Sequence, residues 1–154
     1  MTKEELQNYR SLERERRQVK AKLEEIETAL YSPRAQQLTG MPSAPPKPGS
    51  MLEAAVARHT EDLEALREHY QELLDRLTTE QLNIEKAIDS LDTTARTLMR
   101  HRYIDGRKWE EICVLMNYSW RQVHRLHAAA LITLRGGENE NTRTVERPGE
   151  AGEF

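Results

Sequence analysis

Side chains able to bind phosphates or nucleic-acid bases are concentrated in one short stretch of the chain. Residues 93–135 hold eight Lys/Arg and three Asp/Glu, although the whole chain of 154 residues has a formal net charge of −3. The residues with suitable chemistry are Arg102, Arg107, Lys108, Trp120, Arg121, Gln122, His124 and Arg125. Clustered positive charge of this kind is typical of a surface that binds a polyanion.

The candidates form two groups according to the helix predicted to carry them. Arg107 and Lys108, with Arg102 as a weaker candidate, surround the start of a predicted helix at 107–116, where backbone amides and positive side chains can hold phosphates. A second predicted helix at 120–135 directs several side chains outward from its first turns. These are Trp120, Arg121, Gln122, His124 and Arg125. Arginine can bridge the O6/N7 edge of guanine and glutamine the N6/N7 edge of adenine, so this group includes residue types that read bases.

The connection between these two helices has the features of a helix-turn-helix. Cys113 offers a small side chain where the helices would cross, and Asn117 tolerates the left-handed backbone that the turn needs. Ser119 can cap the second helix, in which Val123 and Leu126 face inward. We therefore expect a helix-turn-helix domain in this part of the chain.

Three motifs, Y-I-D-G, W-E-E-I and Y-S-W-R-Q-V-H-R-L-H, give residues 91–135 a resemblance to known families. The segment resembles the promoter −35-binding region 4 of bacterial sigma factors, and more closely the phage and prophage transcription regulators of the ArpU/RinA kind. This resemblance implies that outward residues of the last helix touch the major groove, with His124 and Arg125 at base-reading positions. The chain departs from the pattern at Cys113, where alanine is usual, and at Trp120, where a polar residue is frequent.

Two longer helices are predicted before this domain. Residues 2–30 contain no Gly or Pro, and a stripe at steps of three and four runs along them: Tyr9, Leu12, Arg16, Val19, Leu23, Ile26 and Leu30. A similar stripe runs through 51–90, with polar residues at positions 80 and 81. Because neither helix can bury its stripe alone, we expect an antiparallel, coiled-coil-like hairpin over 1–90, with pairing to a second copy left open. The segment 32–50, with five of the six prolines, would be its loop.

Capping residues and composition set the remaining boundaries. Thr2 with Glu5 has capping-box spacing, and Asp92 can cap a third helix at 93–104 that braces the helix-turn-helix. Residues 136–154 are acidic and punctuated by Gly and Pro, so they are predicted to be a disordered tail. The expected fold is thus all-α, with a helical hairpin over 1–90 followed by a helix-turn-helix domain over 91–135.

Several classes of function lack candidate residues. The adjacent Glu110 and Glu111 diverge around a helix and cannot act as a catalytic pair, and no phosphate-binding glycine loop is present. His124, His127 and Cys113 do not have the spacing of a zinc site. We expect no enzyme activity, no metal and no cofactor. The single cysteine and the lack of a long apolar run predict a cytoplasmic protein without a membrane span.

The favoured hypothesis is a sequence-specific transcription regulator of phage or prophage type that binds double-stranded DNA. Its N-terminal helices would serve oligomerisation. One alternative is a small terminase subunit, which also joins a DNA-recognition domain to helical oligomerisation segments. A second alternative is an adaptor that contacts RNA polymerase and binds DNA weakly.

Overall fold

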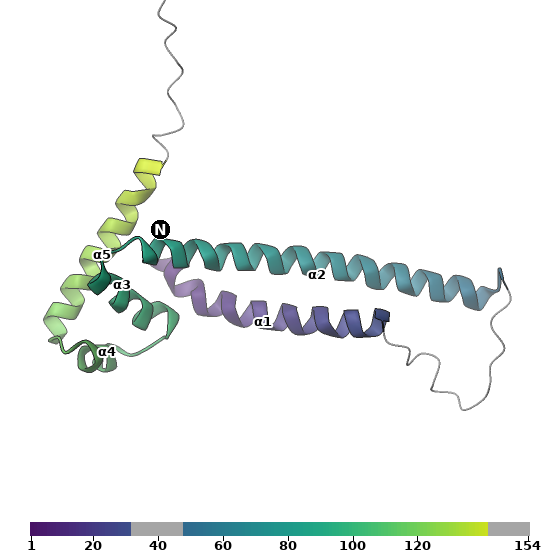
Figure 1. Ribbon diagram of the computed structural model, residues 1–154, viewed down its shortest axis with the longest axis horizontal. Coiled ribbons are helices and arrows are strands. Elements are labelled where there is room, and N and C mark those ends of the chain that lie inside the picture. Colours follow the sequence, from purple (N-terminus) through teal and green to yellow (C-terminus); the bar gives the residue numbers. More distant parts are fainter. Residues whose placement is uncertain (32–47, 142–154) are drawn as a thin grey trace, which may run out of the picture. The chain divides into compact units, whose positions relative to one another are not determined.

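The computed structural model describes residues 1–31 and 48–141, with side chains described as far as residue 136. The described residues form helices and no strand, which confirms the prediction of an all-α fold (Figure 1). The elements in chain order are α1 (Lys3–Tyr31), α2 (Met51–Asp89), α3 (Thr93–Met99), η2 (Arg100–Ile104), α4 (Trp109–Met116) and α5 (Trp120–Asn141). Most of the predicted loop at 32–50, and the tail from residue 142, lie outside the described residues.

The chain divides into two compact units. Unit 1 combines Met1–Glu13 with the chain from Glu80 onward, and unit 2 consists of Arg14–Thr79. Both long helices therefore contribute to both units. The boundary predicted at residue 90/91 lies inside unit 1, where residues on its two sides share one core.

Side-chain caps fix the starts of several helices. The Thr2 N–H donates to the Glu5 carboxylate at 2.6 Å, and the Glu5 N–H donates to the Thr2 hydroxyl at 3.3 Å, so the predicted capping box is present. The Asp92 carboxylate accepts from the Ala95 N–H at 3.2 Å, as predicted for the start of α3. Each cap satisfies a backbone donor that the first turn of a helix leaves without an intrahelical partner.

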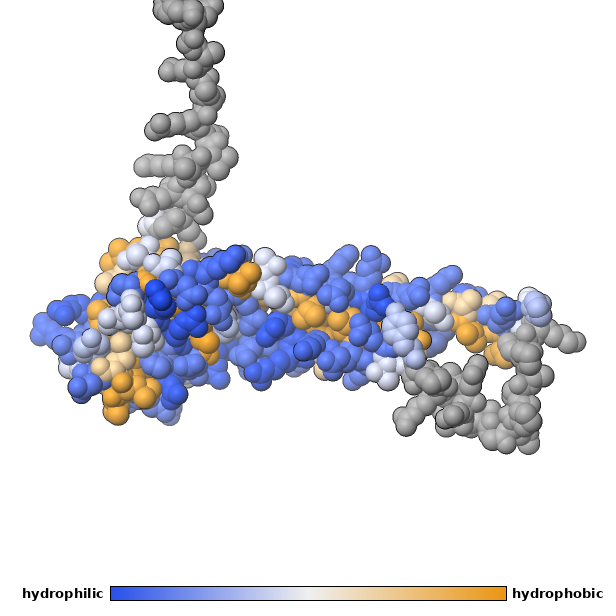
Figure 2. Space-filling model, in the orientation of Figure 1, coloured by the Kyte–Doolittle hydropathy of each residue, from blue (hydrophilic) through white to orange (hydrophobic). Residues whose placement is uncertain are grey.

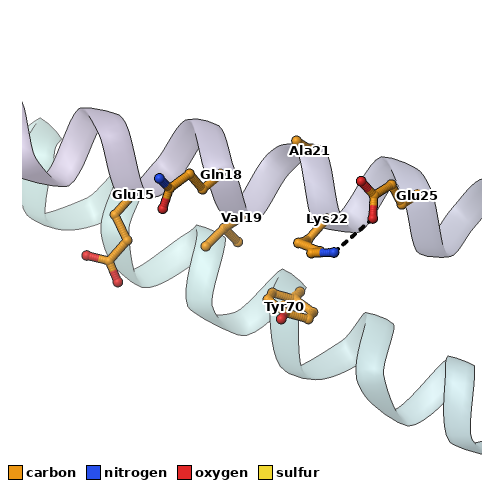
Figure 3. Close-up of a pocket in the computed structure, with 7 residues that line it drawn as sticks. All are labelled: Glu15, Gln18, Val19, Ala21, Lys22, Glu25 and Tyr70. Atoms are coloured by element: carbon orange, nitrogen blue, oxygen red, sulfur yellow. Dashed lines mark hydrogen bonds and ion pairs between the residues drawn. The ribbon is translucent and has the colours of Figure 1, made fainter.

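In unit 2, α1 and α2 lie side by side and run in opposite directions (Figure 1). The contact stripe contains Val19, Leu23, Ile26 and Leu77, which are all buried. Figure 3 shows Val19 directed toward α2, with Tyr70 below Lys22 and the Lys22–Glu25 ion pair beside them. Near the end of α1, the Arg67 guanidinium donates a hydrogen bond to the Tyr31 hydroxyl. The apolar stripe of residues 14–30 is thus a packing surface.

The start of α2 has no such cover among the described residues. Met51 is 91% exposed, Leu52 64% and Val56 58%, and Figure 2 shows apolar surface at this end of the helix. The same apolar stripe that is buried later in α2 therefore faces outward over its first turns.

Unit 1 contains two apolar clusters. The larger one joins the start of α1, the end of α2, α3, η2 and α5, and its buried members are Leu6, Tyr9, Ile84, Ile88, Leu91, Ala95, Met99, Tyr103, Ala130 and Leu134. The smaller one joins α3, α4 and α5 through Leu98, Ile112 and Val123. A fully buried Leu or Ile side chain contributes about 1.5–3 kcal/mol relative to an exposed one, so both clusters stabilise the arrangement of α3, α4 and α5.

Three element boundaries differ from the sequence-based expectation. The helix predicted at 93–104 changes at Arg100 to a π-helical turn, in which the Asp105 N–H donates to the Arg100 carbonyl. The helix predicted from 107 begins at Trp109, because Lys108 has an extended backbone. The last helix does not end at 135 but continues to Asn141. Gly136 and Gly137 do not terminate it, since a glycine inside a helix costs only about 1 kcal/mol relative to alanine.

Candidate nucleic-acid interface

A tight turn joins α4 to α5. Asn117 has a left-handed backbone (φ 54°, ψ 43°), and the Tyr118 N–H then donates to the Cys113 carbonyl at 3.1 Å. The Gln122 N–H donates to the Ser119 hydroxyl at 3.3 Å, and the Ser119 N–H donates to the Gln122 side-chain oxygen at 2.9 Å. The left-handed turn residue and the serine cap that the sequence predicts are both confirmed.

The crossing of α4 and α5 is fixed by the smaller core cluster. Ile112 and Val123 are fully buried against Leu98 of α3. Cys113 and Leu126 are half-buried at its edge, consistent with the inward positions predicted for them. Because the inward side of α5 is held at Val123, the orientation of its opposite side is also fixed.

Three of the predicted base-reading side chains lie on that opposite side of α5. Arg121, Gln122 and Arg125 are exposed, and neither arginine forms an ion pair within the described residues. The Gln122 side-chain oxygen is occupied by the Ser119 N–H, so its amide NH₂ is the group left to face outward. Trp120, in the first turn, is 52% exposed.

His124 differs from the other predicted base readers, because it does not face outward freely. Its ring is half-buried between Trp109, at 4.5 Å between ring centroids, and Trp120, at 4.6 Å. Its Nε2 atom is buried without a hydrogen-bond partner. Helical periodicity gives the direction of His124 from α5 but does not reveal that the indole rings cover it.

Trp109 connects His124 to the residues that precede α4. It is half-buried against the smaller core cluster, as the sequence predicts, and the Arg102 guanidinium lies over its ring at 4.5 Å from the centroid. The Arg102 guanidinium and the rings of Trp109, His124 and Trp120 therefore form one continuous row, in which neighbouring aromatic rings are tilted by 43° or 44° to each other. We call these four residues the aromatic row.

A buried polar pair lies behind the aromatic row. The Tyr103 hydroxyl and the His127 Nε2 are 2.7 Å apart, and Trp109 meets the His127 ring edge-on. Burial, with the nearby Lys3 and other cationic groups, lowers the pKa of His127 to about 4. His127 is therefore neutral near pH 7, and its Nε2 can accept a hydrogen bond from the Tyr103 hydroxyl. The sequence signal for this inward position is the spacing of His127 from Val123 and Ala130.

The predicted phosphate anchors surround the start of α4. Arg107 and Lys108 are exposed, and the Arg107 Nε is 3.8 Å from the Asp105 carboxylate. The Arg102 side chain is half-buried and donates to the Arg107 carbonyl at 2.9 Å. The Lys108 N–H is occupied by the Glu111 carboxylate at 2.9 Å, so the side chains of Arg107 and Lys108 are the groups left for an anion.

Comparison of this chain with protein-family models, curated proteins and solved structures finds no match. Within residues 1–31 and 48–136, no group of three His, Cys, Asp or Glu side chains is placed to hold a metal ion. None of the helices in the described ranges is long and apolar enough to cross a membrane. The assignment of function therefore depends on the geometry of α4, α5 and the side chains around them.

Proposed function

We propose that this chain is a sequence-specific DNA-binding transcription regulator of phage or prophage type, in which α4 and α5 act as a helix-turn-helix. The observation that carries the proposal is the outer side of α5. Arg121 and Arg125 lie one turn apart there, exposed and without an ion pair among the described residues, while Val123 holds the other side of the helix in the core.

This arrangement suits the major groove of DNA. The groove is about 12 Å wide and admits one α-helix, and an arginine that enters it can bond both acceptors of guanine. Arg121, Arg125 and the amide of Gln122 would contact bases, whereas Arg107 and Lys108 would contact phosphates. Trp120, half-exposed at the start of α5, would pack against the sugar–phosphate edge. His124 would act by holding Trp120 in place through the contact between their rings.

The N-terminal helices would form a hairpin that pairs with a second copy of the chain. The apolar stripe at the start of α2 supports this part of the proposal, because Leu52 and Val56 are exposed although the stripe is typical of a packing seam. A dimer would suit a two-fold DNA site, whereas a ring of many copies would favour the small-terminase alternative.

Binding to two duplexes at two salt concentrations tests the proposal. We expect Arg121→Ala and Arg125→Ala each to cost roughly 1–3 kcal/mol on the preferred sequence and less on a scrambled duplex, because base contacts carry sequence information. We expect Lys108→Ala to weaken binding to both duplexes equally and to reduce the salt dependence by about one phosphate contact. Arg58→Ala, which removes an exposed arginine of α2, is the charge-matched control.

Two results would contradict the proposal. Equal losses on both duplexes for Arg121→Ala and Arg125→Ala would remove the base-reading role. No binding by the wild-type protein at low salt would remove the DNA-binding function itself.

An RNA polymerase adaptor is the second candidate, and an apolar patch on α4 favours it. Val114 is 81% exposed, Leu115 53% and Tyr118 36%, and Figure 2 shows apolar surface over α4. Contiguous exposed apolar surface is typical of protein contact sites. If the chain is an adaptor, it should co-purify with polymerase in the absence of DNA. Val114→Lys with Leu115→Lys should abolish that association, whereas loss of DNA binding alone would argue against it.

A further inference from the structure

The start of α1 reaches the loop before α4 through Arg10. Its guanidinium lies against Gly106, so closely that a Cβ atom at this position would be 2.2 Å from the Arg10 Nη1. Gly106 also has a positive φ of 69°, a backbone conformation that other residues rarely adopt. A glycine at 106 therefore permits both the turn and the approach of Arg10.

Arg10 and Arg102 line the same small hollow. Its volume is about 180 Å³, and the other residues that line it are Gln7, Tyr103 and Gly106. No carboxylate lines the hollow. The Tyr103 hydroxyl is already bonded to His127, so the guanidiniums and the Gln7 amide are the polar groups that remain for a ligand.

Neither guanidinium in the hollow is neutralised within the described residues. Arg102 donates to a backbone carbonyl and stacks on Trp109, and Arg10 forms no ion pair. Arg100 is a useful contrast, because its guanidinium contacts Asp89 at 2.7 Å and Glu85 at 3.3 Å. Two arginines without carboxylate partners at one hollow are suited to an anion with several acceptor oxygens, such as a phosphate.

We infer that this hollow binds a phosphate of the DNA backbone, so that α1 is part of the DNA-contacting surface. The inference rests on the proposed function and adds a contact outside residues 91–135. The aromatic row supplies the connection: Arg102 belongs to the hollow, and the row ends at Trp120 in the first turn of α5. A duplex held at α5 would place a flanking phosphate at Arg10, which positions the protein but reads no base.

DNA titration of full-length variants tests the inference. We expect Arg10→Gln to weaken binding about 3- to 10-fold on the preferred and scrambled duplexes alike, and to lower the salt slope by about one phosphate contact. Arg10→Lys keeps the charge and should retain most of that slope. Arg14→Gln removes an exposed arginine one turn further along α1 and should bind as the wild type does. Thermal melts of each variant separate lost binding from lost folding.

The possible outcomes distinguish this inference from the proposed function. Wild-type binding by Arg10→Gln, together with weakened binding by Arg121→Ala, would overturn the phosphate site and leave the DNA-binding proposal intact. The Arg10 Nε signal in NMR, followed during addition of inorganic phosphate without DNA, tests for a free anion. A response to inorganic phosphate, with no effect of Arg10→Gln on DNA affinity, would assign the hollow to a free anion and overturn the DNA-backbone contact. Absence of DNA binding by the wild type would overturn both proposals.

Discussion

Units 1 and 2 use the same two long helices but enclose them differently. Among the residues whose side chains are described, the largest fully buried ones all belong to unit 1: Leu6, Ile88, Leu98, Met99, Ile112 and Val123. Unit 2 buries its stripe less completely: Leu23 is 7% exposed, but Leu66 on the facing helix is 42% exposed. Two helices alone can cover only one stripe of each other. In unit 1, the shorter helices also pack against the start of α1 and the end of α2.

The polar contacts show the same difference. In unit 1, the Tyr9 hydroxyl donates to Glu85, and Arg100 joins Glu85 to Asp89, so that side chains of α1, α2 and η2 form one network. In unit 2, the Lys22–Glu25 ion pair lies within a single exposed helix, where such pairs contribute little, and the Arg67–Tyr31 hydrogen bond that joins α2 to α1 is also exposed. Unit 1 is therefore the part in which single substitutions should have large effects.

The largest effect is expected from cutting unit 1 at the boundary that the sequence indicates. On sequence alone, 91–135 would fold as a separate domain of marginal stability. Since Leu6, Tyr9 and Ile88 belong to the same core cluster as Ala95 and Met99, we expect the fragment 91–135 to show no cooperative thermal transition by circular dichroism. A chain that joins residues 80–135 through a flexible linker to residues 1–13 should restore it. A cooperative transition in the short fragment would show that the shared core is dispensable.

A smaller effect is expected from single core truncations, which compare the two units directly. Ile112→Ala should cost about 3–4 kcal/mol, because Ile112 is fully buried and its truncation leaves a cavity between Leu98 and Val123. Leu23→Ala in unit 2 should cost less, roughly 2 kcal/mol, since Leu23 is buried between two helices and not among several. Val114→Ala, at an exposed position of α4, should change stability by less than about 0.5 kcal/mol. Both tryptophans lie in unit 1, so their fluorescence during urea unfolding reports on that unit, whereas far-ultraviolet circular dichroism follows the helices of both units. Equal costs for Ile112→Ala and Leu23→Ala would remove the contrast.

The smallest of the three effects is a pH dependence confined to unit 1. Burial lowers the pKa of His127 to about 4 from an ordinary value of 6.5, so between these values the unfolded chain binds a proton that the folded chain does not. The stability of unit 1 should therefore be greatest above pH 6.5 and fall by about 2 kcal/mol between pH 7 and pH 5. Unfolding followed by tryptophan fluorescence at each pH measures this loss. His127→Gln should flatten the profile, and His59→Gln, at an exposed position of α2, should leave it unchanged.

Local signals in the sequence predicted much of the fold. The helix caps and the turn depend on contacts within three residues along the chain, so residue type and sequence neighbours predict them. The examples are the caps at Asp92 and Ser119 and the left-handed turn at Asn117. The periodic spacing of apolar residues predicted the helices. It also predicted the buried side of α5 from Val123 to Leu134, because buried positions recur with the helical turn.

Long-range proximity was not predictable in the same way. The start of α1 packs against residues about 100 positions later in the chain, which is why Leu6 is fully buried and Arg10 lies against Gly106. No local sequence pattern predicts this contact. The environment of His124 depends on Trp109 from a different helix. The base-reading and phosphate-binding roles remain predictions until DNA binding is measured.

The discontinuity of unit 1 has a consequence for how the protein is made. Leu6 is synthesised near the beginning of the chain, yet Leu134, a member of the same core cluster, is translated 128 residues later. At about 5–20 residues per second, that interval is on the order of ten seconds, and all residues of unit 2 are synthesised within it. The nascent chain thus emerges from the ribosome with its α1 stripe available for pairing before unit 1 can close. We expect α1 and α2 to associate first, and the module carrying α4 and α5 to form last.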